Sequence, residues 1–129
     1  MSEQTQAIQG LLRFLPLLQN HEAVYDRIGY WGDMTSRVSA TTARDLFQYL
    51  YRHGFILENF DWMQWSDHAL AFEEDRSKLS TADLPTLYKI ITTHIRADRF
   101  TEGHYDSILE NGFLADVLLR FKEISELRK

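Results

Sequence analysis

The residues best suited to chemistry lie close together near position 100. Residues 94–104 read HIRADRFTEGH, and they supply two guanidinium groups, two carboxylates and two imidazoles within a short stretch. Guanidinium groups bind carboxylates and phosphates through paired, charge-assisted hydrogen bonds. A pocket formed by Arg96, Asp98 and Arg99, with His104 beside it, is therefore a candidate site for a small anion or polar ligand.

A structural role for the same segment is the alternative. Helical spacing places Asp98 three residues after Ile95, on the apolar stripe of its helix. A carboxylate in such a position must be paired or hydrogen-bonded. Arg96 or Arg99, a Tyr or Trp side chain, or backbone amides of a helix beginning after Gly103 could each supply the partner. In this interpretation Asp98 ties two helices together.

A second dense segment, residues 59–65, is rich in aromatic side chains. Asp61 is followed three residues later by Gln64, the pattern of a capping box at a helix start. Trp62 and Trp65 then fall on one side of that helix, where they either belong to the core or line a ligand cleft. The candidate ligand-binding set is therefore Arg96, Asp98, Arg99, His104, Asp61, Trp62 and Trp65.

Other chemistries find little support in the sequence. The chain has no cysteine, which excludes disulfides, thiolate metal sites and a Cys nucleophile. Its five histidines are scattered, and although His94 and Asp98 could share a helix face, no His-Glu-x-x-His spacing occurs. Neither a Gly-x-Ser-x-Gly elbow nor a glycine-rich phosphate loop is present. We therefore expect no metal, no cofactor and no catalytic residue, and an enzyme is not the favoured interpretation.

Composition and charge limit the classes of protein to which this chain can belong. The chain has 129 residues and a net charge of −5, so we expect one domain over residues 1–129. An acidic chain lacks the basic field with which proteins bind nucleic-acid phosphates. The longest apolar run, residues 11–18, contains Arg13 and Pro16 and is too short to span a bilayer. No signal-peptide pattern opens the chain, which favours a cytoplasmic protein without membrane contact.

The elements that must position these residues are helices. Apolar side chains recur three and four residues apart in segment after segment, and Gly and Pro are scarce. We therefore predict an all-α fold, a compact orthogonal bundle of about five or six helices. The helices are expected near residues 4–15, 42–53, 61–72, 84–100, 105–111 and 113–127, with a short piece after Pro16 to about residue 25.

Local signals predict where some helices begin and end. Thr41 or Thr42 can cap the helix that ends before Gly54, and Asp83 can cap the helix whose first turn holds Pro85. We expect residues 73–78 to form a solvated loop and Phe100 to plug the core. Residues 28–40 show no regular pattern and no strand alternation. Their Tyr30 and Trp31 could cover the core or contact a ligand or partner.

The last two predicted helices raise the question of DNA binding. They meet at Gly112, as the two helices of a helix-turn-helix would meet at their turn. The second helix of that motif needs polar base-reading residues at its start, whereas this one begins with the apolar residues 113–115 and then Asp116. A helical hairpin in the core explains the same residues, so nucleic-acid binding is disfavoured.

Several segments together resemble one protein family. They are residues 60–62 with Trp65, then 82–84, 96–104, 112–114 and 118–121. The sequence resembles a family of small, uncharacterised bacterial and phage-associated proteins, classed as a domain of unknown function. The similarity runs from about Gly10 to Phe121 and is sharpest in the string Arg-x-Asp-Arg-Phe-x-x-Gly at residues 96–103. The resemblance implies a bacterial, cytoplasmic origin and a helical fold, and it supplies no functional residues.

Three functions stay open at this point. The leading hypothesis is a non-enzymatic binding or interaction module, with a protein partner or a second copy of the chain. The alternative is a small-ligand-binding protein or enzyme that uses Arg96, Asp98 and Arg99. The third hypothesis is a DNA-associated regulator.

Overall fold

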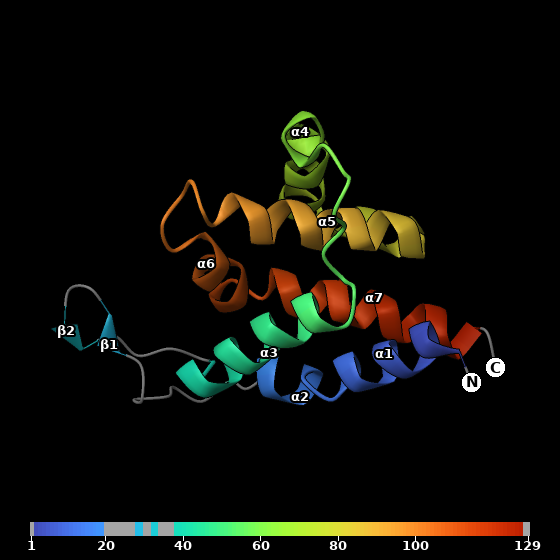
Figure 1. Ribbon diagram of the computed structural model, residues 1–129, viewed down its shortest axis with the longest axis horizontal. Coiled ribbons are helices and arrows are strands. Elements are labelled where there is room, and N and C mark those ends of the chain that lie inside the picture. The colour runs from blue at the N-terminus through green and yellow to red at the C-terminus, as the bar shows by residue number, and fades with distance from the viewer. Residues whose placement is uncertain (1, 20–27, 30–31, 34–37, 128–129) are drawn as a thin grey trace.

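Figure 1 shows the computed structural model of the chain. The structure describes residues 2–19, 28–29, 32–33 and 38–127. Seven α-helices lie within these residues, and a 3₁₀ helix, η1, connects two of them. The all-α prediction is confirmed. The helices are α1 (Glu3–Leu12), α2 (Leu15–Leu18), α3 (Ala40–Arg52), α4 (Trp62–Glu74), α5 (Leu84–Ala97), α6 (His104–Glu110) and α7 (Phe113–Leu127), with η1 at Arg76–Thr81.

Helix α7 is the centre of the packing. It contacts α1, α2, α5, α6 and η1. Helix α5 lies above α7 in Figure 1, and α4 packs across α5 on the side away from α1. Helix α5 is therefore held between α4 on one side and the α6–α7 pair on the other.

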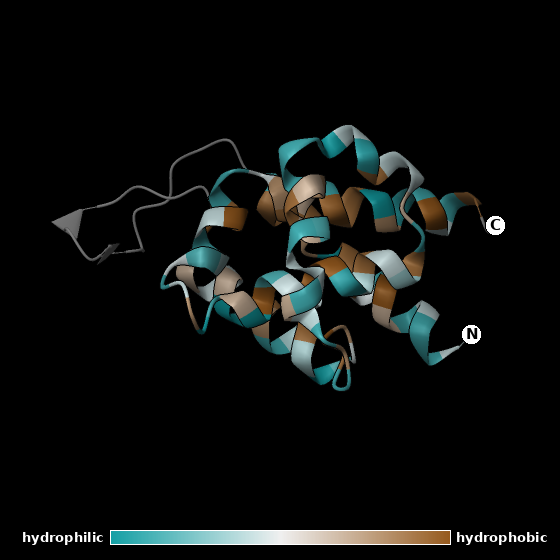
Figure 2. Ribbon diagram, turned by 90° about the horizontal axis from the view of Figure 1, so that it is seen from above, coloured by the Kyte–Doolittle hydropathy of each residue, from teal (hydrophilic) through white to brown (hydrophobic). Residues whose placement is uncertain are grey.

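The core is apolar and aromatic. Phe55, Phe113 and Phe121 are among its largest fully buried side chains, and α5 is buried continuously from Ile90 to Ile95. Figure 2 shows apolar and polar residues alternating along the helices, as expected where only one face of each is covered. Burial of these faces is the main driving force for folding.

Two of the three predicted helix starts are confirmed. The Asp61 carboxylate accepts a hydrogen bond from the Gln64 amide at 3.3 Å, and the Asp83 carboxylate accepts one from the Thr86 amide at 3.0 Å. The prediction for α3 was wrong by a few residues. Ser39 is the cap of α3, because the Ser39 hydroxyl oxygen accepts a hydrogen bond from the backbone N–H of Thr42.

The predicted loop at residues 73–78 is largely helical. Helix α4 continues through Glu74, and η1 begins at Arg76. Asp75 separates the two helices, and its carboxylate accepts hydrogen bonds from the amide and hydroxyl of Ser77. Because Asp75 can cap the next turn in this way, the charged run folds instead of remaining an open loop.

The end of α5 also differs from the prediction. The helix ends at Ala97, and Phe100 is 70% exposed instead of plugging the core. The Thr101 amide donates to the Ala97 carbonyl, and Gly103 follows with a φ of 82°. This left-handed turn redirects the chain into α6 and leaves the Phe100 ring outside.

Residues 28–33 contain a strand pair that the sequence pattern did not predict. Strands β1 (Ile28–Gly29) and β2 (Gly32–Asp33) are antiparallel, with Ile28 opposite Asp33. Two residues are too few to show alternation. The predictions for Tyr30 and Trp31, and for a helical piece beyond α2, concern positions outside the described residues.

The contact between α1 and α3 gives a first testable prediction. The Tyr49 hydroxyl donates to the Ala7 carbonyl at 2.7 Å, and a Cβ on Gly10 would collide with that hydroxyl. Alanine in mid-helix ordinarily gains about 1 kcal/mol over glycine. We expect Gly10→Ala to lose about 1–3 kcal/mol in urea unfolding instead, because the α1–α3 contact is overpacked. Gln6→Ala on the exposed face of α1 is the control, and a gain in stability for Gly10→Ala would contradict the prediction.

Candidate functional site

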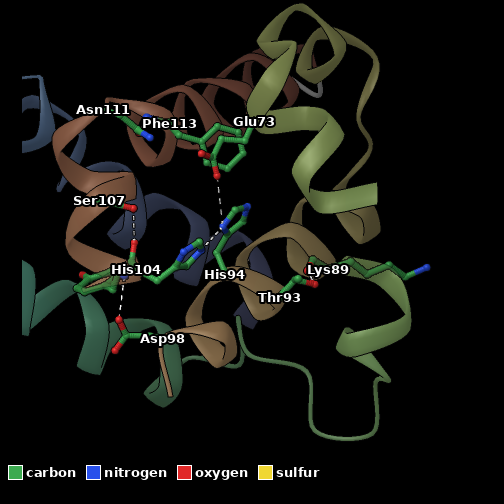
Figure 3. Close-up of polar contacts among 10 residues, drawn as sticks. Glu73, Lys89, Thr93, His94, Asp98, His104, Ser107, Asn111 and Phe113 are labelled. Carbon is green, nitrogen blue, oxygen red and sulfur yellow. Dashed lines mark hydrogen bonds and ion pairs between the residues drawn. The ribbon is translucent and has the colours of Figure 1, made fainter. Parts of the chain in front are cut away.

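Asp98 connects α5 to α6 through one hydrogen bond. Its Oδ1 accepts the backbone N–H of Tyr105 at 2.9 Å, in the first turn of α6 (Figure 3). The residue before α6 is Gly103, which has no side chain to cap the helix. Asp98 therefore caps α6 from the preceding helix. Of the partners considered from the sequence, the backbone amides after Gly103 are the ones the structure shows.

This cap gives a second testable prediction. We expect Asp98→Ala to lower the free energy of unfolding by about 1–2 kcal/mol, the usual cost of removing a helix cap. Asp98→Asn should lose less, because its amide oxygen can still accept the Tyr105 amide hydrogen. Urea unfolding measures both variants. Equal losses for the two variants would indicate that the charge of Asp98, and not its hydrogen bond, is what matters.

The two arginines of the candidate pocket have different surroundings. Arg96 is half-buried, and its Nη2 donates to the Leu57 carbonyl at 3.4 Å. Arg99 is exposed. Within the described residues, neither guanidinium forms an ion pair with Asp98. The structure therefore does not bring Arg96, Asp98 and Arg99 together around one point.

The tryptophans of α4 have separate surroundings. The Trp65 ring lies 6.0 Å from Phe60 and 6.4 Å from Phe72 and packs against the edge of the core. The Trp62 ring lies 5.8 Å from the ring of the exposed Phe100. Trp62 is thus the candidate residue that joins the start of α4 to the segment at residues 94–104, while Asp61 is occupied as a helix cap.

His104 has an imidazole partner that the sequence analysis missed. His94 Nδ1 and His104 Nε2 are 2.8 Å apart, and the two rings are nearly parallel (Figure 3). His94 is only 5% exposed, and the Phe113 ring covers it at 5.0 Å. The Glu73 carboxylate of α4 approaches His94 Nδ1 at 3.8 Å. The pair therefore lies where α4, α5, α6 and α7 meet.

The burial of His94 keeps it uncharged. Desolvation, and then the positive charge that His104 carries when protonated, lower the pKa of His94 to about 4. The backbone of Ala69 opposes this shift only in part. Among the described residues, no group meets His94 Nε2 in hydrogen-bond geometry. His94 Nδ1 shares a hydrogen bond with His104 Nε2, and which of the two nitrogens donates depends on the tautomers of the rings.

The signal for this histidine was present in the sequence. His94 falls in the series Leu87, Ile91, His94 and Asp98, whose spacing of four, three and four marks one helix face. A polar residue on a buried face needs a partner, as was argued for Asp98. The partner, His104, could not be identified because it lies beyond the Gly103 turn. In the described part of the chain, no group of three His, Cys, Asp or Glu residues is arranged to hold a metal ion.

A third feature is the outward face of α4. Met63 is 57% exposed and Leu70 is 47% exposed, and the exposed carboxylates Asp67 and Glu74 alternate with them along the helix. We call these four residues the α4 outer stripe. Ala69 is the only fully buried residue of α4.

A cleft lies elsewhere, between α1, the end of α3 and α5. Its volume is about 610 Å³, which is in the range of small-molecule pockets. It contains none of the candidate residues derived from the sequence. Its lining residues are Glu3, Gln4, Gln6, Ala7, Tyr49, Arg52, His53, Gly54 and Tyr88.

In a comparison with known families, the chain matches a family model described as "Family of unknown function (DUF6508)" over residues 3–127. The chain belongs to this family. The resemblance to a domain of unknown function is thereby confirmed. No curated protein and no solved structure matches the chain.

The DUF6508 match covers all the features described above. It includes the His94–His104 pair, the Asp98 cap, the α4 outer stripe and the cleft. None of the described helices is both long and apolar enough to cross a bilayer. The family description assigns no activity, so a function must be argued from these features themselves.

Proposed function

We propose that this DUF6508 chain is a non-enzymatic protein-binding module. Its binding surface would be the α4 outer stripe together with the adjoining Trp62–Phe100 pair. The observation that carries the proposal is the exposure of Met63, Leu70 and Phe100, three large apolar side chains on and beside one helix. Exposed apolar side chains that gather on one surface, with polar residues among them, are typical of protein-interaction sites.

The place of α4 in the fold supports this proposal. The helix packs against α5 and η1 and stands at the top of the molecule in Figure 1, so its outer face is uncovered. Phe100 adds to the same region because the turn at Gly103 leaves its ring outside, against Trp62. Aromatic rings and Met are enriched at the centres of protein interfaces.

The two alternative functions receive less support. In a ligand site built on residues 96–99, the three charged side chains would converge, but Asp98 is occupied by the Tyr105 amide and Arg96 points to Leu57. A DNA-reading helix would expose its first turn, whereas Phe113 and Leu114 at the start of α7 are buried. We propose that the module is a single domain over residues 1–129 and acts in a bacterial cytoplasm. The family resemblance and the cysteine-free sequence support that setting.

Site-specific photo-crosslinking tests the proposal. A photoreactive residue at Met63 should yield a defined adduct with another protein in cells, and the same residue at the exposed Lys122 of α7 should not. The identified partner should bind the purified chain, and Leu70→Ser with Phe100→Ser should weaken that binding at least about tenfold, a loss expected of interface centres. Binding that is unchanged in this double variant, or adducts that are equal at both positions, would overturn the proposal.

A further inference from the structure

The surface of α4 carries charge as well as apolar side chains. We infer that its partner is a basic amphipathic segment, in which Lys or Arg side chains alternate with large apolar ones. This inference rests on the proposed function above and adds the chemistry of the partner.

The order of side chains in the stripe is regular. Met63, Asp67, Leu70 and Glu74 are spaced by four, three and four residues, so they form one line along the helix. Apolar and acidic side chains alternate along this line over about 16 Å, given the helical rise of about 1.5 Å per residue. A partner helix that lies along it would place its own anchors at a similar spacing.

The segment around the stripe is uniformly acidic. Between Leu57 and Asp75 there is no Lys or Arg, and there are six carboxylates: Glu58, Asp61, Asp67, Glu73, Glu74 and Asp75. This segment therefore carries more negative charge than the net charge of the whole chain, which is −5.

Some of these carboxylates are already engaged. Asp61 and Asp75 cap the two helices, and Glu73 faces His94. In the part of the chain that the structure describes, Asp67 and Glu74 have no Lys or Arg partner. Together with the exposed Glu58, the two carboxylates of the stripe are thus left to meet charge from outside.

Two nearby cations lie on the inner side of α4, and Arg76, just beyond the end of the helix, is already paired with Asp116. The Lys89 ammonium lies over the Phe60 ring at 5.8 Å, and the Arg96 guanidinium reaches the Leu57 carbonyl. Both belong to α5, which packs against the inner face of α4. Among the residues that the structure describes, no Lys or Arg pairs with Asp67 or Glu74, and a basic partner would supply the missing charge.

The same charge argues against other occupants. In a symmetric contact between two copies of the chain, Asp67 and Glu74 would approach the same carboxylates of the second copy. Nucleic acid and an anionic bilayer would both be repelled by this surface. The carboxylates would attract a basic segment and fix its position along the stripe. The affinity would come from the apolar side chains of Met63, Leu70 and Phe100.

Synthetic peptides of opposite charge test the inference. Two helical peptides share one apolar face of Leu and Trp, and the polar face carries Lys and Arg in one and Glu in the other. Fluorescence anisotropy with the full chain should show the basic peptide binding at least about tenfold more tightly, a preference that falls as salt screens the charges. Equal binding of the two peptides would overturn the inference.

Matched charge variants test whether the preference for the basic peptide depends on the carboxylates of the α4 outer stripe. Asp67→Asn with Glu74→Gln should weaken binding of the basic peptide about three- to tenfold and flatten its salt dependence. Asp45→Asn with Glu126→Gln changes the net charge equally on exposed positions of α3 and α7 and should leave binding unchanged. Equal losses for the two double variants would show a general charge effect and overturn the inference. Circular dichroism verifies that every variant is folded.

The failure of this inference can be told from the failure of the proposed function. If the acidic peptide binds as well as the basic one and Leu70→Ser abolishes both, the surface is a docking site but the basic partner is wrong. If neither peptide binds in a way that depends on Leu70, and crosslinking from position 63 also fails, both proposals are overturned.

Discussion

Lowering the pH from 7 toward 4 is expected to destabilise the protein through His94. The pKa of His94 is about 4 in the folded chain, against an ordinary value of 6.5. The unfolded chain therefore binds the extra proton more readily than the folded one between these two values. Stability from this group is fully present above pH 6.5, declines as the pH falls toward 4, and changes no further below it.

The size of this effect follows from the two pKa values. A tenfold difference in proton affinity is worth about 1.4 kcal/mol, so the full contribution of His94 is about 3 kcal/mol. This is a large part of the stability of a small domain, about 5–15 kcal/mol. Urea unfolding at a series of pH values, with the chain and a His94→Leu variant measured side by side, gives the contribution as a difference.

The controls separate His94 from other titrating groups. His94→Leu should remove most of the pH dependence between 6.5 and 4, because no buried imidazole remains to be charged. His68→Gln removes an exposed imidazole and should leave the dependence intact. If His94→Leu retains the full slope, the dependence belongs to other groups, and the neutral His94 inferred from burial would be wrong.

Phe113→Ala is expected to cause the largest loss of stability of any substitution considered in this protein. Phe113 is fully buried at the start of α7, covers the His94 ring and lies under the Arg76 guanidinium at 5.8 Å. Replacing a buried Phe with Ala removes its transfer free energy and leaves a cavity, at a cost of about 3–5 kcal/mol. Denaturant unfolding at pH 7 measures this loss.

The same substitution should change the titration of His94. A cavity beside His94 Nε2, which has no hydrogen-bond partner among the described residues, would admit water and reduce the desolvation of the ring. We expect the pKa of His94 to rise toward 6.5 in Phe113→Ala, measured by an NMR titration of the imidazole. Phe100→Ala makes the same chemical change on an exposed ring and should alter stability by less than about 0.5 kcal/mol. Similar losses for the two variants would contradict the burial argument.

The fold could be predicted from local patterns, and the site only in part. Asp61 and Asp83 each cap the backbone amide of a residue only three positions later, so the starts of α4 and α5 could be predicted from the sequence. Ser39 was overlooked because Thr41 and Thr42 offered the same chemistry nearby. Phe100 was misplaced because helical periodicity was extended three residues past Ala97, where the helix ends.

The contacts that decide the site are mostly tertiary. The approach of His104 to His94 depends on the Gly103 turn, and that of Glu73 on how α4 crosses α5. The series of residues 87, 91, 94 and 98 predicts that His94 is buried, but it cannot tell what lies opposite. The divergence of Arg96 from Asp98 likewise depends on the position of the Leu57 carbonyl in another part of the chain.

The sparse burial of α4 has a consequence for the order in which the structure opens. Only Ala69 of this helix is fully buried, whereas α5 buries eight of its residues. Segments with few buried contacts open locally at a lower free energy than the global transition. Amide hydrogens in α4 should therefore exchange with solvent before those of α5, and a bound partner should slow the exchange most at this helix. The part of the molecule that is most exposed to a partner is thus also the part that can adjust its backbone to fit one.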